Sequence, residues 1–263
     1  MAEPEGFAIL DCPHLSPRQN MGKLSEKVAI VTGASRGIGR GIAAALAREG
    51  ATLVLNSRGA DRLEALAAEL RAADSQVEAL AGDVSQEDVV ERLFARSLES
   101  FGRVDLLVNN AGAFDGGPLD AFDIAAWDSV LATNLRAPFL CTRAALAIMK
   151  RQRSGRIINI GSISASRVRP HSAAYSASKH GLWGLTQVAA LEGREYGVTV
   201  CCLNPGNIAV ERRQESTAIE DREPMISVAD IAEVALLMAT LPPNVEMLEA
   251  TVLPHEQKYV GRG

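Results

Sequence analysis

Short apolar runs alternate with amphipathic segments along the chain from residue 27 onward. Between the runs, apolar side chains recur at helical spacing, as at Ile38, Ile42 and Leu46. Runs that are apolar throughout and separated by helices are typical of a parallel sheet covered on both faces. We therefore expect an α/β domain with a doubly wound, seven-stranded parallel sheet. Its predicted strands are residues 28–31, 52–55, 77–81, 105–108, 156–160, 198–203 and 248–253, and its predicted helices are 38–46, 61–73, 85–101, 136–151, 173–196 and 229–239, with Ser85 as a helix cap.

The length of the chain fits one large domain, and its net charge excludes some classes of binding partner. The chain has 263 residues, of which 47% are hydrophobic. Its formal net charge of −5 argues against nucleic acid or an anionic membrane as a partner, and no apolar run approaches a membrane span. The cysteines lack metal-site or CxxC spacing, which favours a reducing, cytoplasmic location and no metal. They are Cys12, Cys141, Cys201 and Cys202, the last two expected as buried fillers.

Two segments stand apart from the predicted fold. Residues 1–20 lack the basic start and the long apolar run of a secretory signal, so we expect a disordered N-terminal extension before a single domain at 21–263. Eight of the thirteen residues 211–223 are charged. We interpret residues 211–226 as a mobile flap at the substrate; a plain surface loop is the alternative that composition leaves open.

A glycine-rich turn at residues 32–39 joins the first predicted strand to the first predicted helix. Gly33 permits a tight turn, Gly37 lets the backbone approach a phosphate, and Gly39 lets the helix pack close to the strand. The free amides and the dipole of the helix start favour an anion there. This context predicts a Rossmann-type nucleotide site, although the glycine spacing is wider than the usual fingerprint and an isolated match would fit a turn without ligand. Its other predicted contacts are Ser35, Arg36 and Ile38.

The end of the second strand indicates which cofactor binds. NAD sites usually carry an acid there for the ribose 2′-hydroxyl, whereas this run ends Asn56-Ser57-Arg58 without a carboxylate. Arg58 and Arg36 are both suited to forked hydrogen bonds with a 2′-phosphate. We therefore predict NADP(H) rather than NAD(H), with Ser57 and Arg58 at the ribose; two solvated surface arginines are the alternative.

Tyr175 and Lys179 lie four residues apart in the long predicted helix and share one of its faces. An ammonium beside a phenol favours the phenolate, so Tyr175 can act as general acid in ketone reduction or as general base in alcohol oxidation. Lys179 can also reach the cofactor ribose. An isolated Tyr-x3-Lys pair would be better interpreted as two exposed helical side chains, so its context decides.

Further polar residues supply that context. Ser162 follows the strand at 156–160, at the edge where open α/β sheets bind ligands, and can hydrogen-bond the substrate oxygen beside Tyr175. Ser164 is a rival with the same chemistry. Asn134 precedes a predicted helix and can hold a water that relays protons to Lys179.

With these motifs in order, the chain resembles the short-chain dehydrogenase/reductase family, and within it the bacterial 3-oxoacyl-carrier-protein reductases and related NADP-dependent ketoreductases. Each motif is weak alone, but together they are highly specific and span residues 24–206. The motifs are residues 32–39, Asp83-Val84, Asn109-Asn110-Ala111-Gly112, Asn134, Ser162, Tyr175-Ser176-Ala177-Ser178-Lys179 and Asn204-Pro205-Gly206.

The resemblance implies a role for each motif. Tyr175 is the acid/base, Ser162 rather than Ser164 is the catalytic serine, Lys179 favours the phenolate and binds ribose, and Asn134 is the fourth catalytic residue. Family members commonly dimerise through the long helix and pair again into tetramers, so we expect a homodimer or homotetramer. The implied cofactor contacts are Asp83 and Val84 at adenine, Asn110, Ala111 and Gly112 at the sheet centre, and Pro205, Gly206 and Ile208 at the nicotinamide.

Three features depart from the family pattern. Val210 occupies the position where many relatives carry a threonine near the nicotinamide carboxamide, so one polar contact is missing or replaced. Residues 253–263 stand in place of a glycine-rich tail and are expected to contact a neighbouring subunit or to fray. The charged flap is short, which leaves the exact substrate open.

Two other groups of residues admit more than one interpretation. Arg167, Arg169 and His171 precede the catalytic helix and suit an anionic substrate or an acidic carrier protein, although solvated loop charges are the simpler interpretation. Gly181 and Gly184 lie inside that helix, where each costs roughly 1 kcal/mol relative to alanine. Close approach of another helix would explain them.

We therefore predict an oxidoreductase that transfers a hydride between NADP(H) and a carbonyl or secondary alcohol, with reduction of a ketone or 3-oxoacyl thioester as the main hypothesis. An NAD-dependent alcohol or sugar dehydrogenase is the first alternative, and cofactor preference separates the two. A catalytically silent NADP-binding regulatory protein is an alternative of another class. The fold alone would not decide against it, but intact Ser162, Tyr175 and Lys179 do.

Overall fold

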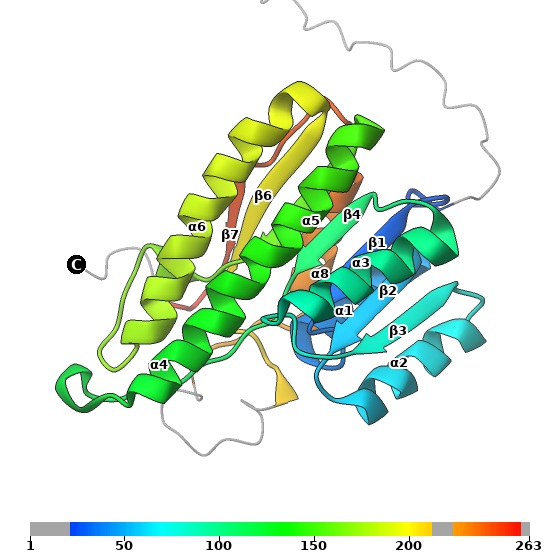
Figure 1. Ribbon diagram of the computed structural model, residues 1–263. Helices are drawn as coiled ribbons and strands as arrows, with labels where there is room; N and C mark the ends of the chain where they lie inside the picture. Colours follow the sequence, from blue (N-terminus) through cyan, green and yellow to red (C-terminus); the bar gives the residue numbers. More distant parts are fainter. Residues whose placement is uncertain (1–21, 212–222, 259–263) are drawn as a thin grey trace, which may run out of the picture.

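The computed structural model describes residues 22–211 and 223–258. One parallel sheet of seven strands runs through it in the order β3-β2-β1-β4-β5-β6-β7 (Figure 1). This confirms the predicted doubly wound, seven-stranded sheet. The strands are β1 (Val28–Thr32), β2 (Thr52–Ser57), β3 (Val77–Ala81), β4 (Leu106–Asn109), β5 (Gly155–Ile160), β6 (Val198–Pro205) and β7 (Glu249–Val252).

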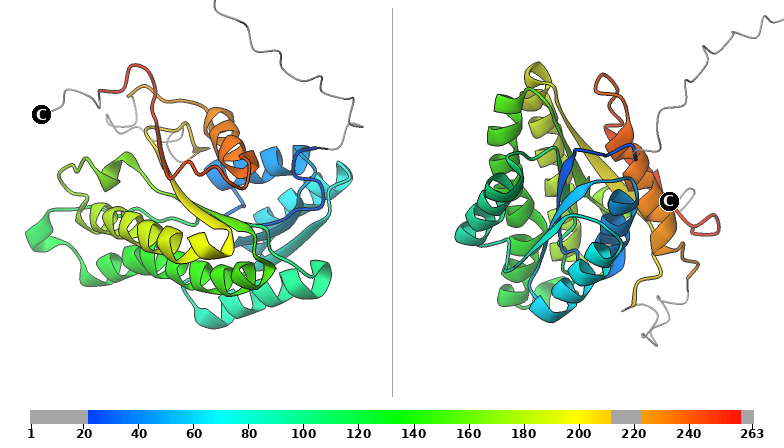
Figure 2. Two further views of the ribbon diagram at one scale, coloured as in Figure 1. Left: turned by 90° about the horizontal axis from the view of Figure 1, so that it is seen from above. Right: turned by 90° about the vertical axis from the view of Figure 1, so that its right-hand side faces the viewer.

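Helices cover both faces of the sheet, which is why most of its strands are apolar on both sides (Figure 2). On one face Ile42, Leu63 and Ile231 pack against the strands, and on the other Leu93 and Met149 do. The first layer contains α1 (Gly37–Arg48), α2 (Ala60–Ala72) and α8 (Val228–Thr240), and the second contains α3 (Glu87–Phe101), α5 (Ala137–Gln152) and α6 (Ala173–Gly193).

The strand order reverses between β1 and β4, which are neighbours in the sheet although β2 and β3 separate them in sequence. The chain leaves β1 toward one face and leaves β4 toward the other, so the carboxyl ends of these strands open a crevice. In open α/β sheets, ligands bind at this point. The site therefore has to be sought at the carboxyl edge of β1, β4 and β5.

The helical run before α5 is longer than we predicted. Asp123 caps α4 (Ile124–Leu131) by accepting a hydrogen bond from the Ala126 amide at 2.8 Å. A π-helical turn, η2 (Ala132–Arg136), then joins α4 directly to α5. A π turn adds a residue to the helical repeat, which shifts the apolar pattern out of phase and explains why the sequence predicted only the second part.

The predicted cap at Ser85 is wrong. Gln86 is the residue that precedes α3, and Ser85 is buried one position earlier. Its amide donates to the Asp83 carboxylate at 2.9 Å, and its carbonyl oxygen accepts from Arg136. Ser85 therefore closes the turn after β3 instead of capping the helix.

Gly181 and Gly184, the two glycines inside α6, differ in their surroundings. A Cβ at Gly181 would lie 2.9 Å from the Leu135 side chain, so close helix approach is confirmed there. A Cβ at Gly184 would meet nothing within 4 Å. The helix itself ends at Gly193 and continues as a short 3-10 turn, η4 (Arg194–Tyr196), where we had predicted a single helix to residue 196.

Three cysteines, Cys141, Cys201 and Cys202, are buried and unpaired, and burial raises the pKa of each thiol to about 12. Among the described residues, no helix is long and apolar enough to cross a membrane, and no cluster of three or more histidine, cysteine or acidic side chains is arranged to hold a metal ion. The predicted extension at 1–20, residues 212–222 of the predicted flap and residues 259–263 of the tail lie outside the described part.

Candidate active site

Tyr175 and Lys179 lie on one face of α6, beside the carboxyl end of β5. Lys179 is 5% exposed, and its ammonium donates a hydrogen bond to the Ile160 carbonyl oxygen at 2.7 Å. It also lies 5.6 Å from the centroid of the Tyr175 ring. The i, i+4 spacing therefore places a buried cation beside the Tyr175 ring, as predicted.

None of the hydrogen bonds within the described residues 22–211 and 223–258 involves the Tyr175 hydroxyl. The ring is half-buried, and the edge-to-face contact with Phe114, at 5.3 Å between ring centroids, fixes its orientation. The fold thus fixes the position of the Tyr175 ring and leaves its hydroxyl without a hydrogen bond. It is free to donate a proton to, or accept one from, a bound ligand oxygen.

Ser162 ends the stretch that follows β5 and begins a short 3-10 turn, η3 (Ile163–Ala165). Its backbone amide donates to Asn204 Oδ1 at 3.0 Å, and its hydroxyl oxygen accepts from the Ser164 amide at 3.1 Å. Both bonds leave the Ser162 hydroxyl proton free for another acceptor. Ser164, the alternative candidate for the catalytic serine, thus holds the Ser162 hydroxyl in place through its backbone amide.

Asn134 is fully buried in the π turn η2 and connects two other parts of the site. Its Oδ1 accepts from the Ala113 amide at 2.7 Å, and its Nδ2 donates to the Ala113 carbonyl oxygen at 2.8 Å and to Ser178 Oγ at 3.1 Å. Both amide hydrogens are therefore used to tie the loop after β4 to α6. The water relay to Lys179 stays a prediction, and it would depend on the backbone of Asn134 or on the remaining lone pair of Oδ1.

The glycine turn after β1 has the backbone geometry that the sequence predicted. Gly33 and Gly37 adopt positive φ angles of 63° and 54°, which favour glycine. A Cβ at Gly33 would lie 2.8 Å from Ala111 Cα, and one at Gly39 would collide with the Gly33 carbonyl oxygen. Asn110 closes the turn from β4 by donating to the carbonyl oxygens of Thr32 and Gly33.

The N-terminus of α1 fits an anionic group. Arg36 precedes the helix without capping it through its side chain, and the Gly37 amide donates to a carboxylate oxygen of Glu211 at 3.3 Å. A carboxylate thus already uses the amide that we predicted for a phosphate. The helix dipole and the missing Cβ of Gly37 both suit the pyrophosphate of a dinucleotide.

The end of β2 fits a 2′-phosphate better than a ribose hydroxyl. Arg58 follows β2, Arg36 lies in the glycine turn, and both are exposed. Neither makes an ion pair with a described residue, and no acidic residue follows β2 directly. Ser57 Oγ instead donates to the Gly59 carbonyl oxygen at 2.9 Å. At the next strand end, Val84 is buried behind Asp83, where we predicted the adenine.

The loop after β6 is held by a residue of the C-terminal segment. Gln257 Oε1 accepts from the Asn207 amide at 2.9 Å, and a Cβ at Gly206 would collide with that oxygen. Ile208 is buried in the same loop, and Val210, in place of the expected threonine, packs toward Gly37. The C-terminal segment thus packs closely against Gly206, which the sequence did not reveal.

Residues 27–221 match the short chain dehydrogenase family. The chain belongs to this family. It is 38% identical to a 3-oxoacyl-[acyl-carrier-protein] reductase of Synechocystis sp. over 213 residues, which are 81% of this chain and 85% of the relative.

Two solved structures support the same membership of the short-chain dehydrogenase family. A metagenomic short-chain oxidoreductase in complex with NADP is 40% identical, with a TM-score of 0.78 over 89% of this chain and 99% of that one. An alcohol dehydrogenase from Thermococcus sibiricus complexed with 5-hydroxy-NADP is 30% identical, with a TM-score of 0.82 over 89% and 98% of the two chains.

Sequence reasoning missed four residues that shape the site of this short-chain dehydrogenase: Phe114, Asn204, Glu211 and Gln257. Only Asn204 lay in a recognised motif, and Glu211 lay at the start of the charged run that we interpreted as a flap. No spacing connects Phe114 to Tyr175 or Gln257 to Gly206, because those contacts join loops that are distant in sequence.

Proposed function

We propose that this short-chain dehydrogenase reduces a ketone, or the 3-oxo group of an acyl thioester, with NADPH. The observation that carries the proposal is the setting of Tyr175: its ring centroid lies 5.6 Å from the Nζ of buried Lys179, and its hydroxyl has no partner among the described residues. A phenol in this state is suited to exchange a proton with a carbonyl oxygen. The resemblance to a 3-oxoacyl-[acyl-carrier-protein] reductase supports the choice of substrate class.

The chain's own residues divide the work of the reaction. NADPH, when bound, supplies the hydride. Ser162 donates a hydrogen bond to the substrate oxygen, and Tyr175 donates the proton that this oxygen takes up. Lys179, held by the Ile160 carbonyl oxygen, keeps a positive charge behind the phenol so that the phenolate left after transfer is stabilised. Asn134 fixes the loop that carries Phe114, and so the orientation of Tyr175.

The choice of NADPH rests on Arg36 and Arg58. Both guanidinium groups are exposed beside the carboxyl ends of β1 and β2, and neither makes an ion pair with any described residue. A 2′-phosphate would satisfy both charges, whereas a ribose hydroxyl would leave them unused. The NADP complexes of two structurally similar oxidoreductases support the same choice.

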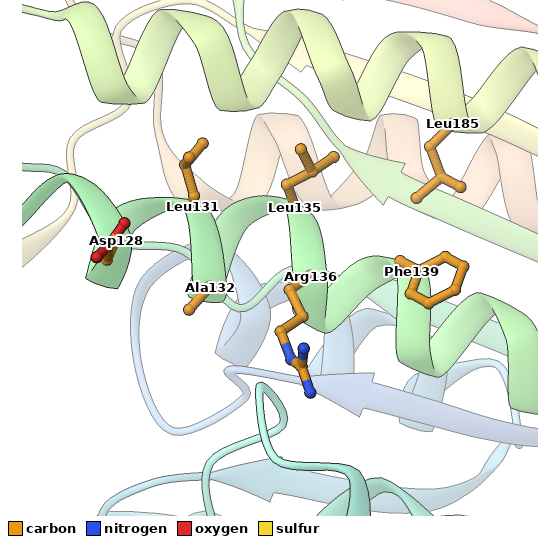
Figure 3. Close-up of a pocket in the computed structure, with 7 residues that line it drawn as sticks. All are labelled: Asp128, Leu131, Ala132, Leu135, Arg136, Phe139 and Leu185. Carbon is orange, nitrogen blue, oxygen red and sulfur yellow. The ribbon is translucent and has the colours of Figure 1, made fainter.

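We also propose that the protein is a homodimer or homotetramer that uses the face formed by α4, α5 and α6. A shallow, mainly apolar hollow on this face includes Leu131, Leu135, Phe139 and Leu185 in its lining, which lies between the helical run α4–η2–α5 and α6 (Figure 3). Phe139 is 46% exposed, and the open position of Gly184 leaves room for a second helix. Three free, buried cysteines support a reducing location such as the cytoplasm.

Absorbance of NADPH, and separately of NADH, tests the proposal with acetoacetyl thioesters and a panel of ketones. We expect oxidation of NADPH at a higher kcat/KM than oxidation of NADH. A preference for NADH would instead favour the NAD-dependent dehydrogenase and contradict the roles of Arg36 and Arg58. Binding of NADPH without turnover of any carbonyl compound would favour a regulatory protein.

A further inference from the structure

One arginine faces the catalytic tyrosine across a single aromatic ring. The guanidinium carbon of Arg169 lies 5.3 Å from the centroid of the Phe114 ring, over its face. The same ring makes the edge-to-face contact with Tyr175, also at 5.3 Å between centroids and with an interplanar angle of 68°. Phe114 therefore stands between a cation and the proton donor.

The loop that carries Arg169 is anchored at several points. Ser172 Oγ donates to the Arg169 carbonyl oxygen at 2.7 Å and lies 2.9 Å from Ser176 Oγ on α6. On the other side, Gly116 packs so closely against the His171 carbonyl oxygen that a Cβ there would collide with it. The loop after β5, the loop after β4 and α6 are thus packed together, and the position of Arg169 relative to Tyr175 is built into the fold.

The charge of Arg169 is not neutralised by any residue that the structure describes. Arg169 is exposed, and its guanidinium forms no ion pair with any residue in 22–211 or 223–258. The acidic residue beside Phe114, Asp115, turns back and accepts from the Gly116 amide at 2.7 Å. An exposed cation–π contact is weak, and it leaves the five N–H donors of the guanidinium free.

We propose that Arg169 binds a carboxylate of the substrate, so that the substrates of this enzyme are oxo acids and the corresponding hydroxy acids. Stacking on Phe114 holds the planar guanidinium ready for two parallel hydrogen bonds to the carboxylate. Phe114 sets the spacing between the carboxylate and the carbonyl group at Tyr175. The carboxylate is unchanged by the reaction, in which the carbonyl carbon gains the hydride and its oxygen gains the proton. The inference rests on the proposed function and adds its substrate class.

The test compares oxo acids with their methyl esters, which keep the carbonyl group and lose the charge. The series runs from a 2-oxo to a 5-oxo acid, so that the distance between carboxylate and carbonyl is varied, and dihydroxyacetone phosphate is added to separate carboxylate from phosphate recognition. The readout is the ratio of kcat/KM for acid to kcat/KM for ester with NADPH. Arg169→Gln removes the charge, and Arg151→Gln, an exposed arginine at the far end of α5, is the matched control.

We expect the wild type to prefer the acid at one spacing in the series. Arg169→Gln should lower the acid-to-ester ratio by roughly 10- to 100-fold, as for a lost hydrogen bond to a charged group. Arg169→Lys should lower it less, because it keeps the charge but loses the fork and the stacking. Arg151→Gln should leave the ratio as it is.

An acid-to-ester ratio that is the same in the wild type and Arg169→Gln would overturn the inference, and reduction of the esters by NADPH would still support the proposed function. A preference for the phosphate compound would overturn the assignment of a carboxylate. If no compound is reduced, the proposed function fails for this panel, and calorimetry with NADP⁺-loaded protein decides the inference. Binding of pentanoate over pentanamide that is lost in Arg169→Gln would support it, and equal binding of both would overturn it.

Discussion

The charged side chains at the two edges of the sheet differ in whether protein groups pair with them. At the amino edge, Asp105 forms two hydrogen bonds with Arg103, both at 2.7 Å, and accepts from the Val28 amide at 3.0 Å. Arg156 is 8% exposed there and donates to Thr199 and to backbone carbonyl oxygens around the end of α8. At the carboxyl edge, Arg36, Arg58 and Arg169 make no ion pair with a described residue.

We interpret this difference as one between charged groups that stabilise the fold and charged groups that are available to a ligand. A buried charge is stable only when its hydrogen bonds are satisfied, and the amino edge meets that condition. An exposed cation without a partner lowers the stability of the fold little, because water solvates it. The carboxyl edge can therefore carry several unpaired arginines whose hydrogen bonds a ligand would accept. We therefore expect substitutions at the amino edge to change stability and those at the carboxyl edge to change binding and catalysis.

The largest effect on stability is expected for Arg156→Met at the amino edge. The substitution removes the donors to the Thr199 hydroxyl and to the Met238, Pro242 and Val245 carbonyl oxygens. We expect the free energy of unfolding to fall by roughly 3 kcal/mol, because buried acceptors lose their partners. Urea denaturation measures this, and turnover per folded molecule should stay the same. Equal stability of variant and wild type would contradict the assigned role of the amino edge.

The next effect concerns cofactor choice at the carboxyl edge. The double substitution Arg36→Ala and Arg58→Glu removes both unpaired cations and adds the acid that favours a ribose hydroxyl. The ratio of kcat/KM for NADPH to that for NADH should fall by roughly 100-fold, as for lost charged hydrogen bonds. Arg62→Glu, an exposed position on α2, is the matched control. An unchanged ratio in the double variant would show that the 2′-phosphate is bound elsewhere.

The smallest effect is expected on NADPH affinity at the Gly37 amide, for which the Glu211 carboxylate and the cofactor would compete. Glu211 accepts from the Gly37 amide, which we assign to the pyrophosphate. Glu211→Gln weakens this competing acceptor and removes a charge near the phosphates, so the NADPH dissociation constant should fall a few-fold, or roughly 0.5–1 kcal/mol. Fluorescence titration measures it, with Glu91→Gln on α3 as control. Weaker binding in Glu211→Gln would mean that Glu211 supports the cofactor instead of competing with it.

The sequence was sufficient for the features that repeat or that act locally. The apolar runs identified the seven strands, since a strand buried on both faces leaves a continuous signal and all of them except the edge strands β3 and β7 are buried in this way. The face shared by Tyr175 and Lys179 followed from helical spacing alone. The tight turn at Gly33 followed from its place between the first strand and the first helix.

Contacts between distant loops could not be predicted in this way. The stack of Arg169 on Phe114 and the docking of Gln257 beside Gly206 depend on how loops from different strands meet, and no periodicity records that. The π turn at Asn134 was missed for a related reason, since it breaks the very repeat by which helices are recognised. The sequence therefore predicted the helix that carries Tyr175 and Lys179, whereas the contacts of the loops around it needed the structure.

Turnover of Tyr175→Phe, measured beside Tyr196→Phe, tests the central claim most directly. Tyr196 is a surface tyrosine whose ring contacts Lys150 and Arg153, so the two variants lose the same atom in different places. We predict that Tyr175→Phe lowers kcat for NADPH-dependent reduction by roughly 10²- to 10⁴-fold at an unchanged melting temperature, and that Tyr196→Phe keeps the wild-type rate. Equal turnover by the two variants would contradict the account, because the proton would then have to come from another group.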